Sequence, residues 1–239
     1  MKKEHFLKVT LLVLLSVFFS ALYTGCAPKS DKPDSNFGGV QVGVITYSWR
    51  SMPSSPRDII SYCLQNGISS IELMGNVAEE YAGAPVVPGR PENFRDLPKE
   101  EMDAYVLKRE NAVKELREWR SSKAQAEKYS ELRKMFDDAG ISIHIVKFSP
   151  ARWSDAEVDY AFESAKILGA RGVSNEIGHE ACKRLGPLAE KHGMFAIFHN
   201  HGQPRDTTFK FEDFLAYSPA NMLNFDVGHY FGATGKHLS

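Results

Sequence analysis

Two short clusters of polar residues carry the side chains best suited to chemistry. His199 and His201 follow one apolar run, and Asp226 and His229 follow another about twenty-five residues later. Short apolar runs of this kind predict buried parallel strands, and chemistry in α/β proteins sits at the carboxyl ends of such strands. Imidazole and carboxylate groups together are suited to a divalent ion of the Mn, Co, Fe or Zn kind.

The spacing of the first cluster indicates which way its side chains point. Side chains alternate between the two faces of a strand, so His199 and His201 are expected on one face and Asn200 on the other. Two imidazoles on one face can share a metal or hold the hydroxyl groups of a substrate. Asp226 is expected to end the neighbouring strand, and His229 to lie in the loop after it. We predict that His199, His201 and Asp226 are metal ligands.

Further candidates lie on other predicted strands. Glu176 ends an apolar strand, where a carboxylate is costly unless it is paired or bound to a metal. We predict that it is a metal ligand or general base, the alternative being a helix cap or salt bridge. Glu72 and Lys147 are candidate substrate contacts, although Glu72 could instead brace a neighbour. Trp49 could form an apolar wall for a sugar ring or pack in the core.

The elements that must position these residues alternate between strand and helix. Ser55 and Asp58 mark the start of the first helix, and Asn66-Gly67 marks its end. Strand–helix repetition of this kind predicts an α/β fold with a parallel sheet and helices outside it. The expected strands cover residues 41–49, 68–74, 141–147, 171–177, 194–198 and 221–226.

One segment interrupts this alternation. Residues 76–120 form an insertion after the second strand, beginning with a loop rich in Gly and Pro. A long charged helix is expected to follow at about 100–138, with a possible break near Ser121. An insertion at a strand end can fold over the pocket as a lid. The alternative is a solvated decoration without a functional role.

The N-terminus has the pattern of a targeting segment. Residues 1–25 combine a basic start with an apolar run, and small residues precede Cys26. This pattern resembles the lipobox of bacterial lipoproteins, in which the cysteine is lipidated, although Tyr23 stands where Leu is usual. We predict an exported protein anchored to a bacterial membrane through Cys26, with residues 26–40 as a flexible tether. The alternatives are a plain cleaved signal and an uncleaved anchor.

Charge and cysteine content narrow the function classes further. Without residues 1–25 the chain has 26 Lys and Arg against 29 Asp and Glu, a net charge of −3. Such a balance lacks the basic face that nucleic-acid binding requires. Cys63 and Cys182 fall in two separate predicted helices, so we expect two buried thiols rather than a disulfide.

The length of the chain suits one incomplete barrel. Residues 41–239 are enough for one domain but fewer than the ~250 that are typical of a complete eight-stranded barrel. No closing helix is expected after Gly228. We therefore expect an open sheet of about six strands and a chain that is truncated at its C-terminus.

Three segments together resemble the sugar phosphate isomerase/epimerase family, the xylose-isomerase-like (β/α)8 TIM barrels. They are Val42 to Trp49, Ile71-Glu72-Leu73, and Asp226-Val227-Gly228-His229, and the resemblance covers most of residues 41–239. It implies a TIM-barrel-like fold in which Asp226 binds metal and His229 meets substrate. Many epimerases of this family carry a Glu where this chain has His199. The His-Asn-His form is similar to a dehydratase- or lyase-like branch.

The resemblance implies a metal-dependent enzyme acting on a carbohydrate or cyclitol. A divalent ion (Mn, Co, Fe, Zn or Mg) would make a C–H group next to a carbonyl more acidic, and Glu176 or His201 would move the proton. Return of the proton gives isomerisation or epimerisation, whereas loss of a β-substituent gives a lyase or dehydratase. A non-catalytic carbohydrate-binding lipoprotein is the alternative from another class. The chain lacks the family's later strands, so this polypeptide is expected to be inactive on its own. The oligomeric state is left open.

Overall fold

The computed structural model describes residues 32–122 and 125–237. The predicted signal peptide, Cys26 and the first part of the tether lie outside these residues. Among the helices of the described part, none is long and apolar enough to cross a membrane.

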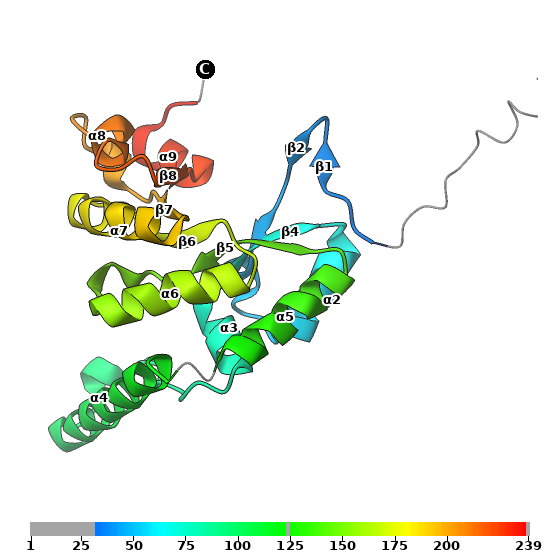
Figure 1. Ribbon diagram of the computed structural model, residues 1–239. Helices are drawn as coiled ribbons and strands as arrows, with labels where there is room; N and C mark the ends of the chain where they lie inside the picture. Colours follow the sequence, from blue (N-terminus) through cyan, green and yellow to red (C-terminus); the bar gives the residue numbers. More distant parts are fainter. Residues whose placement is uncertain (1–31, 123–124, 238–239) are drawn as a thin grey trace, which may run out of the picture. The chain divides into compact units, whose positions relative to one another are not determined.

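Six parallel strands form one sheet in which each strand pairs with the next one along the chain (Figure 1). This arrangement confirms the α/β fold and the six-stranded parallel sheet that the alternating pattern predicts. Within the described residues, the first and last strands of the sheet pair with one neighbour each, so the sheet is open. The strands are β3 (Val44–Ile45), β4 (Ser70–Met74), β5 (Ser142–Lys147), β6 (Gly172–Glu176), β7 (Phe195–His199) and β8 (Asn221–Asn224).

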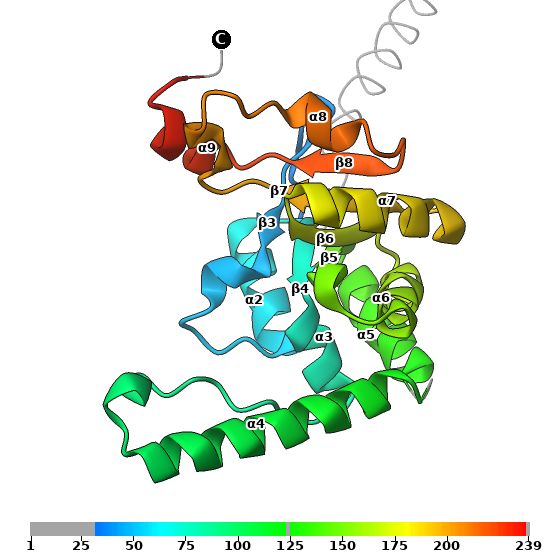
Figure 2. The same cartoon turned by 90° about the vertical axis from the view of Figure 1, so that its left-hand side faces the viewer.

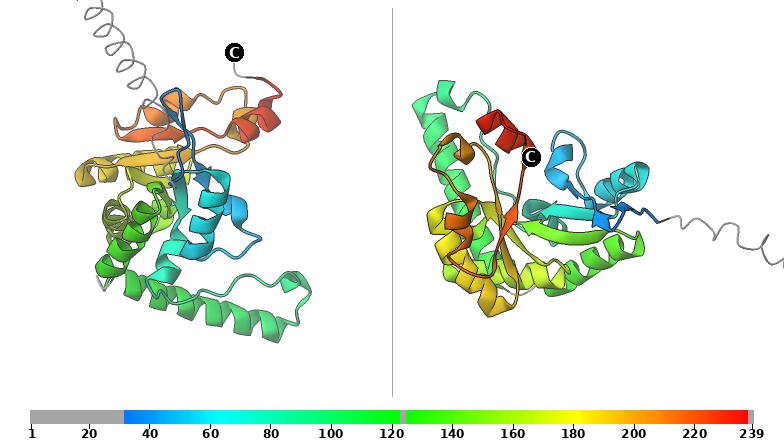
Figure 3. Two further views of the ribbon diagram at one scale, coloured as in Figure 1. Left: turned by 90° about the vertical axis from the view of Figure 1, so that its right-hand side faces the viewer. Right: turned by 90° about the horizontal axis from the view of Figure 1, so that it is seen from above.

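Helices follow the strands and cover the outer face of the sheet. Figure 3 shows the sheet curving, with α6 and α7 on its convex side. Short 3-10 turns lie at Thr46–Trp49, Phe94–Asp96, Pro150–Arg152 and Gln203–Arg205. The α-helices are α2 (Pro56–Asn66), α3 (Gly75–Tyr81), α4 (Lys99–Arg120), α5 (Ala126–Asp138), α6 (Asp155–Ile167), α7 (His179–His192), α8 (Phe211–Leu215) and α9 (Val227–Thr234).

Local sequence signals explain where several helices begin and end. Ser55 and Asp58 form a reciprocal capping box at the start of α2, and Ser154 and Glu157 form another at the start of α6. Gly67 ends α2 with φ 68°, a left-handed conformation that glycine adopts without steric cost.

The core lies between the sheet and its helices. Tyr129 and Phe136 of α5, Phe162 of α6 and Phe198 of β7 are among its largest fully buried side chains. Cys63 and Cys182 are both buried and unpaired, as predicted, and burial raises the pKa of the Cys63 thiol to about 11.

The first predicted strand is much shorter than residues 41–49. Only Val44 and Ile45 pair with β4, after which the Thr46 hydroxyl accepts a hydrogen bond from the Met74 backbone N–H, 3.0 Å away. A side chain therefore takes the place of the next backbone partner, and the chain turns into the 3-10 segment Thr46–Trp49.

The predicted tether also differs from the structure at its C-terminal end. Strands β1 (Asn36–Phe37) and β2 (Val40–Gln41) form an antiparallel hairpin. Gly38 and Gly39, at φ 59° and 86°, make the turn between them. The Ser35 hydroxyl joins the hairpin to the domain by hydrogen bonds with the Val42 carbonyl and the Ser69 N–H and hydroxyl groups.

The insertion contains two helices, α3 and α4, and the long predicted helix is divided between α4 and α5. Every residue of α4 is at least partly exposed to solvent. Figure 2 shows this helix at the bottom of the view. Its last residue, Arg120, donates to the Glu79 carboxylate at 2.8 and 3.2 Å and to Glu157 at 3.0 Å. The guanidinium also lies 3.6 Å from the centre of the Trp153 ring. Arg120 thus attaches the C-terminal end of α4 to helices α3 and α6, which carry Glu79 and Glu157.

Candidate active site

Strand register brings three candidate positions side by side at the carboxyl edge of the sheet. Glu176 of β6 is the register partner of His199 on β7, which is in turn the partner of Asn224 on β8. Partners in adjacent strands point to the same side of a sheet. The polar residues that end these three strands therefore face one space.

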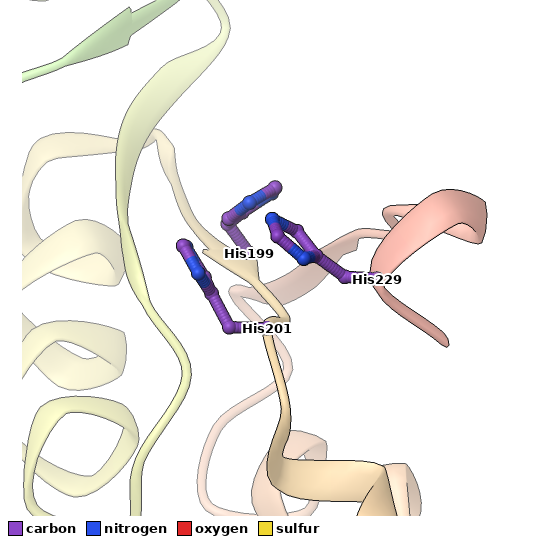
Figure 4. A group of neighbouring side chains, drawn as sticks. All are labelled: His199, His201 and His229. Atoms are coloured by element: carbon purple, nitrogen blue, oxygen red, sulfur yellow. The ribbon is translucent and has the colours of Figure 1, made fainter. Parts of the chain in front are cut away.

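Three histidines gather in that space (Figure 4). Each of His199, His201 and His229 offers one ring nitrogen within 4.8 Å of the other two. The ring centres of His199 and His201 lie 4.7 Å apart, and the rings of His201 and His229 are stacked at 4.3 Å. The structure thus brings together the two clusters that are separate in the sequence.

His229 reaches the cluster from a helix, not from the loop that the sequence analysis predicts. Strand β8 ends at Asn224, and Asp226 caps helix α9 by accepting the His229 backbone N–H on Oδ1 at 2.7 Å. A side-chain acceptor at this position satisfies an amide that the first helical turn leaves without a partner. The other oxygen, Oδ2, lies 4.0 Å from Nε2 of His199. Asp226 therefore both starts the helix and offers a carboxylate oxygen beside the cluster.

Asn200 is not one of the clustered side chains and has a role that the sequence analysis missed. This side chain is fully buried, donates to the Asp226 carbonyl at 3.0 Å and accepts from the Asp226 N–H at 2.8 Å. The paired bonds hold the start of α9 against the end of β7. The one feature of the sequence that could have indicated this role was the position of the Asn200 amide between His199 and His201.

Glu176 lies between a lysine and a histidine. Its Oε1 accepts from Lys147 Nζ at 2.6 Å, and its Oε2 lies 2.8 Å from Nε2 of His201 without the alignment of a hydrogen bond. The Lys147 side chain is only 10% exposed, whereas the Glu176 side chain is 45% exposed. The lysine that was a candidate substrate contact is thus already engaged by the carboxylate.

A cavity of about 310 Å³ lies beside His199 of the cluster and is lined by residues of several strands. His199, Asp226, Glu72, Asn224 and His144 are among its lining residues. The Asn224 amide donates to Oε2 of Glu72 at 2.7 Å, whereas Oε1 of Glu72 is buried without a hydrogen-bond partner in the described part of the chain. Glu72 thus places a carboxylate among the lining residues of the cavity, and one of its oxygens can still accept a hydrogen bond.

Trp49 is not brought to this cluster. It packs against the core, and its ring lies 5.3 Å from the ring of Tyr62 on α2. It is also not among the residues that line the cavity beside His199.

The electrostatic environment favours a neutral His199. Burial lowers the pKa of this imidazole, and the positive charge of Lys147 lowers it further. A neutral imidazole is the form that binds a metal ion.

The donor set fits a divalent metal ion. Zinc–imidazole bonds are ~2.0–2.1 Å long, which puts tetrahedral ligand atoms roughly 3.3 Å apart. The three nitrogens, within 4.8 Å of one another, reach that spacing with small rotamer changes. Asp226 Oδ2 is the adjacent oxygen donor, and the unaligned Glu176 Oε2 lies on the His201 side.

No protein-family model matches the sequence, and no curated protein matches it. Solved structures do match. The solved structures that are similar to this chain include proteins described as a sugar phosphate isomerase/epimerase and a xylose isomerase domain protein. One is a sugar phosphate isomerase/epimerase from Parabacteroides distasonis, with 16% identity and a TM-score of 0.48, covering 87% of this chain and 72% of the neighbour.

Two more solved structures match this chain with similar TM-scores. A probable 3-DHS dehydratase, AsbF, from Bacillus anthracis has 14% identity and a TM-score of 0.49 over 81% of this chain. A xylose isomerase domain protein from Planctomyces limnophilus has 13% identity and a TM-score of 0.46 over the same share, 81%. This chain spans 65% of the length of the dehydratase and 66% of the xylose isomerase domain protein.

Proposed function

We propose that this chain belongs to a metal-dependent enzyme that moves a proton next to a carbonyl group of a carbohydrate or cyclitol. The observation that carries the proposal is the gathering of His199, His201 and His229 beside two carboxylates at the carboxyl edge of a parallel sheet. Active sites of α/β barrels lie at this edge.

The three histidines would hold the ion, with Asp226 Oδ2 as the fourth donor. The bound ion would act as a Lewis acid that polarises a carbonyl or hydroxyl oxygen of the substrate. Because Asp226 Oδ1 is committed to the cap of α9, only Oδ2 is free for this role. Asn200 keeps that carboxylate in place through the Asp226 backbone.

Glu176 is the proposed general base. Lys147 binds Oε1, which leaves Oε2 as the atom that takes up a proton. His201, 2.8 Å from that oxygen, limits where Oε2 can point. As a metal ligand His201 would not itself take up the proton, so Glu176 carries the proton transfer. A base must lie within hydrogen-bond reach of the proton it removes, so the reacting carbon would have to sit between Glu176 and the histidines.

Two reaction outcomes follow from the same proton abstraction. Return of the proton to the same or the neighbouring carbon gives epimerisation or isomerisation. Loss of a β-substituent instead gives a dehydratase or lyase. With His199 held by the metal, the site offers one carboxylate base, Glu176, for one face of the substrate, and this favours the lyase as the second candidate.

Metal content and isotope exchange test the proposal together. The purified protein should contain about one divalent ion per chain and should bind cobalt with the visible absorption of a low-symmetry site. In D₂O, a keto-sugar substrate should exchange the hydrogen next to its carbonyl, contrary to the expectation from the sequence that this polypeptide is inactive on its own. Glu176→Gln should stop this exchange while the metal stays bound. Carbohydrate binding without metal or exchange would instead support the non-catalytic binding protein.

Export and lipid anchoring through Cys26 are part of the proposal as well. A lipidated chain should partition with membranes, and Cys26→Ala should move it to the soluble fraction. If the wild-type chain carries no lipid, the anchor does not exist, whereas the enzyme proposal is unaffected.

A further inference from the structure

A second cavity lies next to Glu176, at the end of β6. Its volume is about 650 Å³, within the range of ~300–1,000 Å³ that small-molecule pockets occupy. The walls come from the loop after β5 and from the start of α7, and they include Ser149, Arg152, Trp153, Glu176, Gly178 and Glu180. Glu176 therefore lines this cavity and also lies 2.8 Å from His201 of the three-histidine cluster.

The loop that forms one wall has an unusual backbone. Ser149 has φ 56° and ψ 51°, and it is the one non-glycine residue with a positive φ in the described part of the chain. Side-chain-bearing residues rarely adopt this conformation, which persists where surrounding contacts impose it. Such positions are concentrated at functional sites.

Hydrogen bonds hold this loop in place from several sides. Ser149 N–H donates to the Ser174 carbonyl at 3.0 Å, and Ala151 N–H donates to the buried Asn175 side chain at 3.0 Å. Arg184 of α7 donates to the Ala151 carbonyl at 2.7 Å. The same Asn175 side chain donates to the Glu176 carbonyl at 2.9 Å. The wall is thus tied directly to the end of β6 that carries the proposed base.

Trp153 gives the cavity an aromatic surface of fixed orientation. The Arg120 guanidinium lies 3.6 Å from the centre of the indole, and Arg120 is itself held by Glu79 and Glu157. A rigid indole offers contact area at little entropic cost. The charged side chains that line the cavity carry both signs: Arg152 is positive, whereas Glu176 and Glu180 are negative. This combination suits a neutral, hydroxyl-rich ring and disfavours a strongly charged group.

We propose that this second cavity is a subsite for the second ring of a glycoside whose first ring reacts beside Glu176 and the three histidines. The inference rests on the proposed function, because Glu176 is the residue shared by the two spaces. It narrows the substrate from a free sugar to a molecule of two linked rings.

Gly178 allows a test that leaves the existing contacts intact. This residue lines the cavity, its φ of 179° is extended backbone that any residue adopts, and a Cβ built on it meets nothing within 4 Å. Gly178→Leu should therefore fill the subsite. Gly89→Leu is the matched control, because Gly89 also has open space around its Cβ and lies in the loop before α4, away from the cavity.

The probes are cellobiose and maltose, compared with methyl β-glucoside and methyl α-glucoside, and binding is measured by calorimetry on the metal-containing protein. The wild-type chain and Gly89→Leu should bind at least one disaccharide about tenfold more tightly than its monosaccharide glycoside. Gly178→Leu should reduce that preference to less than twofold, with unchanged monosaccharide affinity, metal content and circular dichroism. Trp153→Phe should retain most of the preference, and Trp153→Ala should lose it.

The inference is overturned if the wild-type chain shows no disaccharide preference, binds none of the four sugars, or keeps its preference in Gly178→Leu. Failure of the proposed function gives a different result, namely no metal and no isotope exchange. A disaccharide preference that Gly178→Leu removes would then still establish the subsite, as part of a binding protein.

Discussion

The Asn200 side chain makes two hydrogen bonds with the backbone of Asp226, one as donor and one as acceptor, across the gap between β7 and α9. This pairing fixes the position of His229 relative to His199 and His201, because Asp226 starts the helix that carries His229. The three-histidine cluster therefore depends on an amide that does not belong to it.

Replacing Asn200 by Ala should weaken both the fold and the metal site. The Asp226 N–H and carbonyl would lose their partners, at a cost of about 2–3 kcal/mol in the free energy of unfolding. Metal affinity should fall roughly 10–100-fold, as is typical when a residue that supports ligands is removed. Urea denaturation and metal titration measure the two effects. Asn66→Ala, which removes an exposed amide on α2, should change neither.

Replacing any one of His199, His201 and His229 by Ala should reduce the affinity for cobalt or zinc by at least tenfold. Each substitution deletes one of the three nitrogens that lie within 4.8 Å of one another. Calorimetry and the visible spectrum of the cobalt form give the readout. His237→Ala serves as control, since that ring packs on Phe231. If His229→Ala retains full affinity while Asp226→Ala abolishes it, His229 contacts substrate and is not a ligand.

Arg120→Ala should destabilise the domain by about 3–5 kcal/mol, because the buried carboxylate of Glu79 would be left without a cation and that of Glu157 would keep only Arg117, at 3.9 Å. Hydrogen exchange should become faster in α4, whose attachment at Arg120 is lost. Combining Arg120→Met with Glu79→Gln and Glu157→Gln should restore much of the stability. Equal exchange rates in the wild type and in Arg120→Ala would show that α4 is held by other contacts.

Asp159 should make stability depend on pH at the acidic end. A hydrogen bond with His192 and another with Lys191 lower the pKa of this carboxyl group. Since the folded pKa is below the unfolded value of ~3.9, the stabilisation is present above about pH 3.9 and disappears as the pH falls through the lower folded value. The urea midpoint of the wild type should exceed that of Asp159→Asn at pH 7. The difference should shrink steadily toward pH 3, and a constant difference would contradict this assignment.

Much of the fold could be predicted from short-range patterns in the sequence. The strands at 70–74, 142–147 and 172–176 lie within the predicted ranges, and α2 begins and ends where Ser55, Asp58 and Asn66-Gly67 predict. Apolar runs and helix caps are local signals, because a buried strand or an uncapped amide must be satisfied by residues nearby. The candidate chemistry was also visible, since His199, His201, Asp226 and Glu176 each follow or end an apolar run.

Only the tertiary structure decided how these residues meet. Three contacts join residues that are 23 or more positions apart. They are the register pairing of Glu176 with His199, the two hydrogen bonds of Asn200 with the Asp226 backbone, and the hydrogen bond from Lys147 to Glu176. Helix α9 was missed although its cap is local, with Asp226 accepting from the His229 N–H; Asn200 adds the long-range bonds that hold the Asp226 backbone. Sequence patterns fix which residues end a strand, whereas packing and register fix which strand ends share a cavity.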